Sequence, residues 1–303
     1  DQLTKPPGSL GRLEDIAAFM AGWQQTGCPR IETAQALVFA GNHGICDQGV
    51  NPFPQAVTAQ MVANFEAGGA AINQLCLANG ATLSVVPLSL DAPTRDFTQS
   101  PAMTPDETLA SINAGAAAVD PKADILLLGE MGIGNSTIAA ALAAAILGGE
   151  PETWVGAGTG SDAEGMALKA RVIRDGIAKH GTGDPLGVLT SLGGREQAAI
   201  CGAILAARAA RVPVLLDGYI CTAAALALHG VDPKLLDHCL VGHASAEPGH
   251  RKLLAAMGKE PVLDFAMRLG EGTGAALALG IVRSALACHN GMATFAEAGV
   301  SGG

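Results

Sequence analysis

The feature of this sequence that most limits its fold is a repeated order: a short apolar run, a turn containing glycine or an acid, and an alanine-rich helical stretch. The apolar runs do not alternate with polar residues, which is typical of strands buried on both faces of a parallel sheet. The repeated order therefore predicts an α/β fold, a largely parallel, Rossmann-like sheet flanked by helices. Strands are expected over residues 36–40, 83–88, 125–128, 154–156, 187–189, 212–216 and 240–241.

The two ends of the chain differ from this pattern, because each favours a helix without a neighbouring strand. Residues 5–30 indicate a turn followed by an amphipathic helix, and residues 275–290 indicate a long apolar helix. We expect a large α/β domain over residues 31–265, with residues 1–30 and 266–303 forming a small helical lobe beside it. Sequence alone leaves the pairing of the two terminal helices open.

Composition disfavours several classes of partner. The 303 residues carry a net charge of -10 and only 3% aromatic residues, which argues against binding to nucleic acid. The apolar run 138–147 is too short to cross a bilayer, so no membrane association is expected. The seven cysteines are dispersed and never spaced as CxxC, which favours reduced, buried thiols over disulfides or metal ligands. These properties together predict a cytoplasmic protein.

The first candidate binding motif follows the expected strand 125–128. Gly132, Gly134 and Asn135 form a turn before an apolar helix, and Glu130 precedes them. A strand, a glycine turn and a helix in this order direct free backbone amides at an anion. The spacing matches neither the dinucleotide fingerprint nor a Walker loop. A tight turn capped by Asn135 is the simpler alternative, but it explains neither the glutamate nor the three glycines, Gly129, Gly132 and Gly134.

Four further turns place glycines or polar residues after expected strands. An anion bound there would be a single small phosphate held by backbone amides, with Lys169 as a point charge. A helix lysine is more often only solvated, so Lys169 alone is a weak indication. His243 and His250 lack the spacing of a zinc site, and we expect neither a metal nor another cofactor. The candidate binding residues in these turns are Gly158, Thr159, Gly160, Gly194, Asp217 and Ser245.

A carboxylate wrapped in glycines lies near the C-terminus, where Leu269, Gly270 and Glu271 precede the helix 275–290. Glycines let a ligand approach the backbone closely, and a helix N-terminus favours negative charge. Glu271 is therefore a candidate site residue. An acidic residue that caps the helix is the alternative interpretation.

A candidate slot for a flat ring follows the first expected strand. Phe53 and Met61 would supply its apolar walls, and Asn51 and Gln60 its polar groups. Ordinary core packing explains the apolar pair about as well. The sequence contains no G-x-S-x-G elbow and no Ser–His–Asp order, which disfavours acyl transfer. Phosphate-binding turns with carboxylates fit phosphoribosyl transfer instead, because negative charge stabilises an oxocarbenium-like transition state.

The chain resembles the nicotinate-nucleotide–dimethylbenzimidazole phosphoribosyltransferase family from end to end. Each shared motif is modest by itself, but their order and spacing together are specific. The resemblance implies a parallel α/β sheet with a small lobe built from both chain ends, in a homodimer. The motifs that carry it are residues 5–14, Asn42-His43-Gly44, residues 129–137, Lys169, residues 216–218, residues 243–247 and residues 268–274.

The resemblance also implies a reaction, in which nicotinate mononucleotide and 5,6-dimethylbenzimidazole give α-ribazole 5'-phosphate and nicotinate. It implies Glu271 as the catalytic base, supported by Glu130 and Lys169, and a base pocket near Asn51 and Gln60. Related enzymes often carry serine at the position of Asn51. This chain therefore departs from them in the pocket that determines which aromatic base is preferred.

Two other functions stay open at this point. A nucleotide-dependent oxidoreductase would need a G-x-G-x-x-G turn after the first strand, and the sequence there is Gly41-Asn42-His43-Gly44. A non-catalytic nucleotide-binding protein on the same fold is disfavoured by the presence of both Glu130 and Glu271.

Overall fold

The computed structural model describes residues 2–158 and 160–301. Its strands are β1 (Ala34–Ala40), β2 (Thr82–Pro87), β3 (Ile125–Met131), β4 (Val214–Leu216), β5 (Cys239–His243) and β6 (Pro261–Leu263). Its α-helices are α1 (Arg12–Gln24), α2 (Ala56–Glu66), α3 (Ala71–Asn79), α4 (Pro105–Ala117), α5 (Asn135–Leu147), α6 (Ala163–His180), α7 (Pro185–Leu192), α8 (Arg195–Ala209), α9 (Tyr219–Val231), α10 (Pro248–Met257), α11 (Thr273–Gly291) and α12 (Phe295–Ala298). Three short 3-10 helices are η1 (Gly44–Gln48), η2 (Pro151–Thr153) and η3 (Pro233–Leu236).

The strands form one six-stranded sheet in the order β2-β1-β3-β4-β5-β6, and every neighbouring pair is parallel. The predicted fold class, a parallel sheet flanked by helices, is therefore confirmed. All six carboxyl ends lie at one edge of this sheet. In open parallel sheets that edge is where ligands bind.

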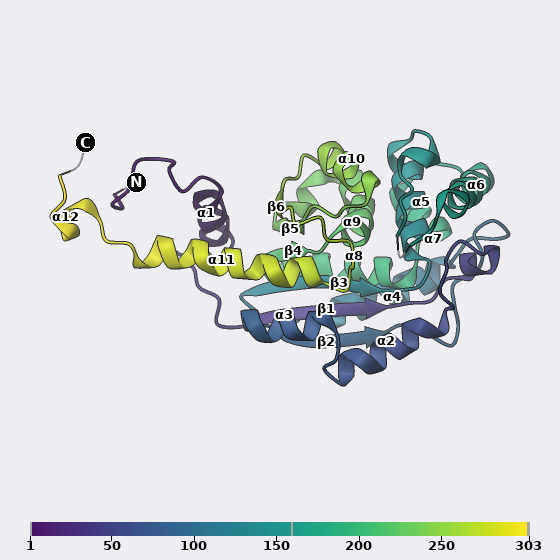
Figure 1. The fold of residues 1–303 in the computed structure, drawn as a ribbon, viewed down its shortest axis with the longest axis horizontal. Helices are drawn as coiled ribbons and strands as arrows, with labels where there is room; N and C mark the ends of the chain where they lie inside the picture. The colour runs from purple at the N-terminus through teal and green to yellow at the C-terminus, as the bar shows by residue number, and fades with distance from the viewer. Residues whose placement is uncertain (1, 159, 302–303) are drawn as a thin grey trace.

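The two faces of the sheet are covered by different sets of helices. In β3, Leu126 and Leu128 pack into a core that includes residues of α5, α8 and α9. Ile125 and Leu127 point to the opposite face, into a core that includes residues of α1, α3 and α11. Figure 1 shows α11 running along this second face, with α1 beside it. Burial on both faces explains why the central strands are continuously apolar.

The two ends of the chain lie together. Ile16 and Met20 of α1 share a core with Leu279 and Val282 of α11, and Leu3 bridges Thr294 in antiparallel fashion. The first turns of α11 also pack against the sheet, so this one helix contacts both the sheet and the N-terminal helix α1. The division into residues 31–265 and a terminal lobe stays a prediction, although the packing of the terminal helices agrees with it.

Two of the seven expected strands are wrong. Residues 187–189 lie within α7, because the Asp184 side chain caps this helix and Pro185 occupies its first turn. Residues 154–156 follow the 3-10 helix η2 and join no strand of the sheet. The sequence also missed β6, a short edge strand that begins at Pro261. The other expected strands are present with shifted ends, and β3 extends to Met131, so that Glu130 belongs to a strand.

Among residues 2–158 and 160–301, no helix combines the length and the apolar character that a bilayer crossing needs. All seven cysteines are free thiols, and four of them are buried as expected, whereas Cys28 is exposed.

Candidate active site

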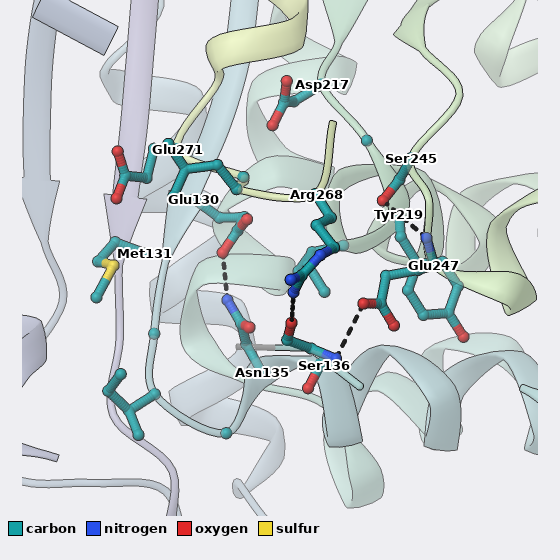
Figure 2. A pocket seen from close by; sticks show the side chains of 18 of the residues that line it. Glu130, Met131, Asn135, Ser136, Asp217, Tyr219, Ser245, Glu247, Arg268 and Glu271 are labelled. Atoms are coloured by element: carbon teal, nitrogen blue, oxygen red, sulfur yellow. Dashed lines mark hydrogen bonds between the residues drawn. The ribbon is translucent and has the colours of Figure 1, made fainter. Parts of the chain in front are cut away.

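A pocket with about 760 Å³ of atom-free space, including its open mouth, lies at the carboxyl ends of β3, β4 and β5. Figure 2 shows acidic side chains along one wall and Ser245, Tyr219 and Glu247 along another. The residues that line it are Asn51, Glu130, Met131, Gly132, Ile133, Gly134, Asn135, Ser136, Gly158, Lys169, Asp217, Gly218, Tyr219, Ile220, His243, Ser245, Glu247, Arg268, Leu269, Gly270 and Glu271.

Glu130 lies at the centre of the pocket wall, near the end of β3. Its side chain is buried and accepts a hydrogen bond from the Asn135 side-chain amide at the start of α5. Burial raises the pKa of Glu130 well above its usual range, and the charges of Asp217, Glu196 and Glu271 raise this pKa further. The carboxyl group therefore has a strong affinity for a proton, or for a cation that takes its place.

Glu271 lies on the turn between β6 and α11. Gly270, Glu271 and Gly272 have φ values of 82°, 63° and 84°, so the turn holds three successive residues in the left-handed region, which only glycine adopts at low cost. A Cβ on Gly270 would lie 2.5 Å from Glu130 Oε1. Glycine is therefore what allows this turn to approach the end of β3.

Glu271 is a buried residue, only 7% exposed, and its carboxyl group has a raised pKa of about 7. Burial is the larger cause of the rise, and the negative charge of Asp217 adds to it. A carboxylate with this pKa is ionised in half of the molecules at pH 7. It is therefore a much better proton acceptor than an ordinary surface glutamate.

Asp217, at the end of β4, binds the start of α11. Its Oδ2 accepts a hydrogen bond from Gly272 N at 3.1 Å, and its Oδ1 accepts one from Ala275 N at 3.0 Å. His243 Nε2 lies 3.6 Å from the same Oδ1. The alternative interpretation of Glu271 as an acidic helix cap is therefore wrong: the cap position is Gly272, and the carboxylate that meets the helix amides comes from another strand.

Lys169, on α6, is buried, contrary to what is usual for a helix lysine. Its Nζ donates to Ser136 Oγ at 3.3 Å and to the Gly156 carbonyl at 3.5 Å. Burial lowers the pKa of Lys169, and the nearby charge of Glu247 opposes this. The ammonium group thus lies at the pocket wall with no carboxylate within ion-pair distance among the described residues.

Gly158 is held on both sides of its peptide backbone. Its N–H donates to Glu247 Oε1 at 2.9 Å, and its carbonyl accepts from the Arg268 guanidinium at 2.8 Å. This contact ties the turn before α6 to the segment before Glu271. The dashed lines in Figure 2 mark these contacts.

Most of the predicted site residues meet in this one pocket. The lining includes both glutamates, Lys169 and Asn51, together with the predicted binding residues Gly132, Gly134, Asn135, Gly158, Asp217, Ser245, Leu269 and Gly270. Thr159 lies outside the described residues. The roles of all of them stay predictions.

Five predicted residues do not line the pocket. Gly194 packs behind it, where a Cβ added to the glycine would lie 2.4 Å from His43 Cε1, and Gly160 lies beside the turn at Gly158. Phe53 and Gln60 are exposed, and Met61 packs against the apolar cluster that contains Met131 and Ile133.

The sequence did not assign roles to several residues of the pocket wall. Arg268 and Glu247 belong to motifs that were recognised, but nothing in the sequence shows that they converge on Gly158. Tyr219 and Ser136 follow directly after Gly218 and Asn135, at the starts of α9 and α5. Their position just beyond a strand-end turn is the signal that could have indicated them.

The chain belongs to the phosphoribosyltransferase family whose model matches residues 1–300. A nicotinate-nucleotide–dimethylbenzimidazole phosphoribosyltransferase of Rhodobacter capsulatus is 65% identical over 301 residues, which cover 99% of this chain and 90% of that relative. The enzyme of the same name from Ruegeria pomeroyi is 61% identical, covering 100% of this chain and 90% of its own length. The crystal structure of CobT from Thermus thermophilus superposes with a TM-score of 0.95 at 43% identity, covering 100% of this chain and 97% of that one.

Proposed function

We propose that this chain transfers the phosphoribosyl group of nicotinate mononucleotide to 5,6-dimethylbenzimidazole, giving α-ribazole 5'-phosphate and nicotinate. The relatives named above share its sequence over nearly the whole length. The observation that supports the proposal most directly is the order of groups along the pocket. In Figure 2, Glu271 and Met131 lie on one side of Glu130, and Ser245 and Glu247 lie on the other.

This order fits the three parts of the reaction. The aromatic base would lie beside Glu271 and Met131, with Asn51 at its edge. The ribose would lie against Glu130, and the nucleotide phosphate would lie on the side of Lys169 and Ser245. Leu269, Gly270 and the glycines of the turns at Gly132 and Gly158 would supply close backbone approach to the nucleotide.

The chemistry needs one proton acceptor. A nitrogen of the benzimidazole forms a bond to the ribose carbon, while the bond from this carbon to the nicotinate nitrogen breaks and its electron pair stays on nicotinate. The pyridinium nitrogen is already cationic, so nicotinate leaves without a general acid. Glu271 takes the N–H proton that the benzimidazole loses. General-base assistance of this kind typically raises the rate ~10²–10⁴-fold.

Glu130 would stabilise the positive charge that develops on the ribose. Its raised pKa favours a bound proton in the free pocket. A cationic nucleotide ring nearby favours the ionised carboxylate, because opposite charges stabilise each other in a buried site. Nucleotide binding would thereby prepare Glu130 for its electrostatic role.

Incubation with nicotinate mononucleotide and a panel of acceptors tests the reaction, with 5,6-dimethylbenzimidazole, purines and phenols as the panel. Mass spectrometry should detect α-ribazole 5'-phosphate and nicotinate in equal amounts. Binding of the nucleotide without product would instead indicate a non-catalytic nucleotide-binding protein. Hydride transfer to an added nicotinamide cofactor would indicate an oxidoreductase.

We also propose that the protein works in the cytoplasm as a homodimer. The resemblance to the family, which implies a homodimer, supports self-association. Light scattering after size-exclusion chromatography should give twice the 30.3 kDa mass of the chain. A monomer at micromolar concentration would contradict the dimer without affecting the proposed reaction.

A further inference from the structure

His250 is a buried histidine that the proposed reaction does not use. It lies in the first turn of α10, directly behind the pocket wall, and its side chain is fully buried. Its ring packs at a tilt against Tyr219, with 6.0 Å between the ring centroids, and Tyr219 lines the pocket. His250 itself does not line the pocket, so any influence on a ligand must pass through its neighbours.

Both ring nitrogens of His250 have hydrogen-bond partners. Nδ1 lies 2.9 Å from the backbone N–H of Ser245, and Nε2 lies 3.1 Å from Thr222 Oγ1. The Thr222 hydroxyl also lies 2.8 Å from the Gly218 carbonyl. A ring with both positions satisfied in a buried site is held in one orientation.

These contacts fix the tautomer of His250. A backbone N–H can only donate, so Nδ1 must carry no proton and must accept from Ser245. Burial lowers the pKa of His250 to about 3, so the ring is neutral at physiological pH and its one proton is on Nε2. Nε2–H then donates to Thr222 Oγ1, and the Thr222 hydroxyl donates its own proton to the Gly218 carbonyl.

The two ends of this hydrogen-bonded chain are parts of the pocket wall. Ser245 follows β5 and Gly218 follows β4, and both line the pocket. The last pair between β4 and β5 joins Leu216 to Val241. The hydrogen-bonded chain through His250 therefore fixes the distance between the two turns beyond the end of that pairing.

No acceptor among residues 2–158 and 160–301 takes the proton of the Ser245 hydroxyl. Its oxygen accepts a hydrogen bond from Glu247 N at 3.3 Å. The hydroxyl proton is thus available to an acceptor in the pocket, and the backbone N–H of Ser245 is not, because it is bound to His250. Figure 2 shows the Ser245 hydroxyl in the pocket wall above Glu247.

We propose that His250 is a positioning residue for the nucleotide end of the pocket: as the neutral Nε2–H tautomer it holds Ser245 against the Gly218 turn, so that the Ser245 hydroxyl donates to an anionic oxygen of the substrate. The inference rests on the proposed function for the identity of that anion, the phosphate of nicotinate mononucleotide. His250 adds no charge, and it acts through geometry alone.

Steady-state kinetics with nicotinate mononucleotide and 5,6-dimethylbenzimidazole test this role. His250→Leu removes both hydrogen bonds, and it should raise KM for the nucleotide about tenfold while changing kcat and KM for the base less than threefold. His250→Asn restores an acceptor for Ser245 N, so it should recover most of the nucleotide KM. Thr222→Val removes one hydroxyl at nearly constant volume, and it should raise the nucleotide KM about threefold even if His250→Leu does not fold.

His238→Leu is the matched control. His238 is also fully buried. Within the described part of the chain its ring bonds the Ile204 carbonyl at 3.0 Å and has a weak contact with the Cys239 thiol. It precedes β5, at the sheet edge opposite the pocket. Its loss should lower Tm without changing the nucleotide KM.

Two results would overturn the inference. One is an unchanged nucleotide KM in both His250→Leu and Thr222→Val, which would make His250 a core residue like His238. The other is a ¹⁵N NMR spectrum of the whole protein that places the His250 proton on Nδ1. The spectrum does not depend on activity, so it tests the inference even if the proposed reaction is wrong. Failure of the proposed reaction would show separately, as a wild-type protein without transfer activity.

Discussion

Replacement of Glu271 by glutamine separates the proposed proton acceptor from the rest of the pocket. Glutamine has the same size and cannot take a proton at neutral pH. We expect Glu271→Gln to lower kcat for 5,6-dimethylbenzimidazole by roughly 10²–10⁴-fold, the usual range for a general base. KM for nicotinate mononucleotide should change little, because Glu271 lies on the side of the pocket away from Ser245 and Glu247.

The pH dependence gives a sharper form of the same prediction. With a pKa of about 7, the carboxylate form of Glu271 is about one tenth populated at pH 6 and about nine tenths populated at pH 8. The wild-type kcat/KM should therefore rise roughly tenfold over this interval. The rise should disappear in Glu271→Gln, and that difference distinguishes titration of the enzyme from titration of the substrates.

The stability of the folded protein should fall with rising pH, whereas kcat/KM rises. The pKa of Glu271 is raised from 4.5 to about 7 in the folded protein, so the folded state binds the proton more tightly than the unfolded state does. The free energy of unfolding therefore falls as pH rises between these values, by no more than about 3–4 kcal/mol and by roughly half of that if water in the pocket mouth screens the charge. Glu271→Gln should raise Tm at pH 8 and leave it nearly unchanged at pH 4.

The assay measures nicotinate release by liquid chromatography across pH 5.5–8.5, with Tm from calorimetry on the same samples. Glu152→Gln is the control, because Glu152 pairs with Arg174 on the surface, away from the pocket. A kcat within threefold of wild type at pH 8, or a wild-type profile without a rise near pH 7, would refute Glu271 as the base.

Two further variants test the neighbouring groups. Lys169→Ala should raise KM for nicotinate mononucleotide about tenfold with no change in KM for the base. Lys179→Ala, on the exposed part of the same helix, is the control and should change neither KM. Equal nucleotide KM values in the two variants would contradict a phosphate role for Lys169. Asp217→Asn removes the charge that helps to raise the pKa of Glu271, so the rise of kcat/KM should move to lower pH, and a midpoint that stays near pH 7 would contradict the electrostatic argument.

The sequence predicted the sheet wherever a strand is both apolar and continued by a turn and a helix. Residues 187–189 show the limit of that pattern, because three apolar residues are compatible with a helix as well as with a strand. The preceding Asp184-Pro185 pair is a helix start signal that the apolar run concealed. The predicted strand over residues 154–156 was wrong for a different reason. A strand forms only where it can pair with the edge of a neighbouring strand, and the sequence does not show which edges are free.

The site was predictable in its chemistry and less so in its contacts. Glu271, Glu130 and Lys169 were identified from turns and from a family resemblance, and they line one pocket. The same turns did not show that Asp217 would reach the start of α11, because that contact joins residues 55 and 58 positions apart. Nor did they show His250 behind Ser245, since a histidine five residues away reaches back only when a helix starts between them.

The contact between Asp217 and α11 has a consequence for the strength of the base. A helix carries about half a positive charge at its N-terminus, and an acid placed there becomes easier to ionise. Glu271 immediately precedes such a terminus, yet the amides of Gly272 and Ala275 are directed at Asp217. The partial charge of the helix is therefore neutralised by a second carboxylate, which in turn repels a charge on Glu271. Burial, with the charge of Asp217 added to it, thus converts a position that would normally hold a strong acid into one that holds a proton acceptor near neutral pH.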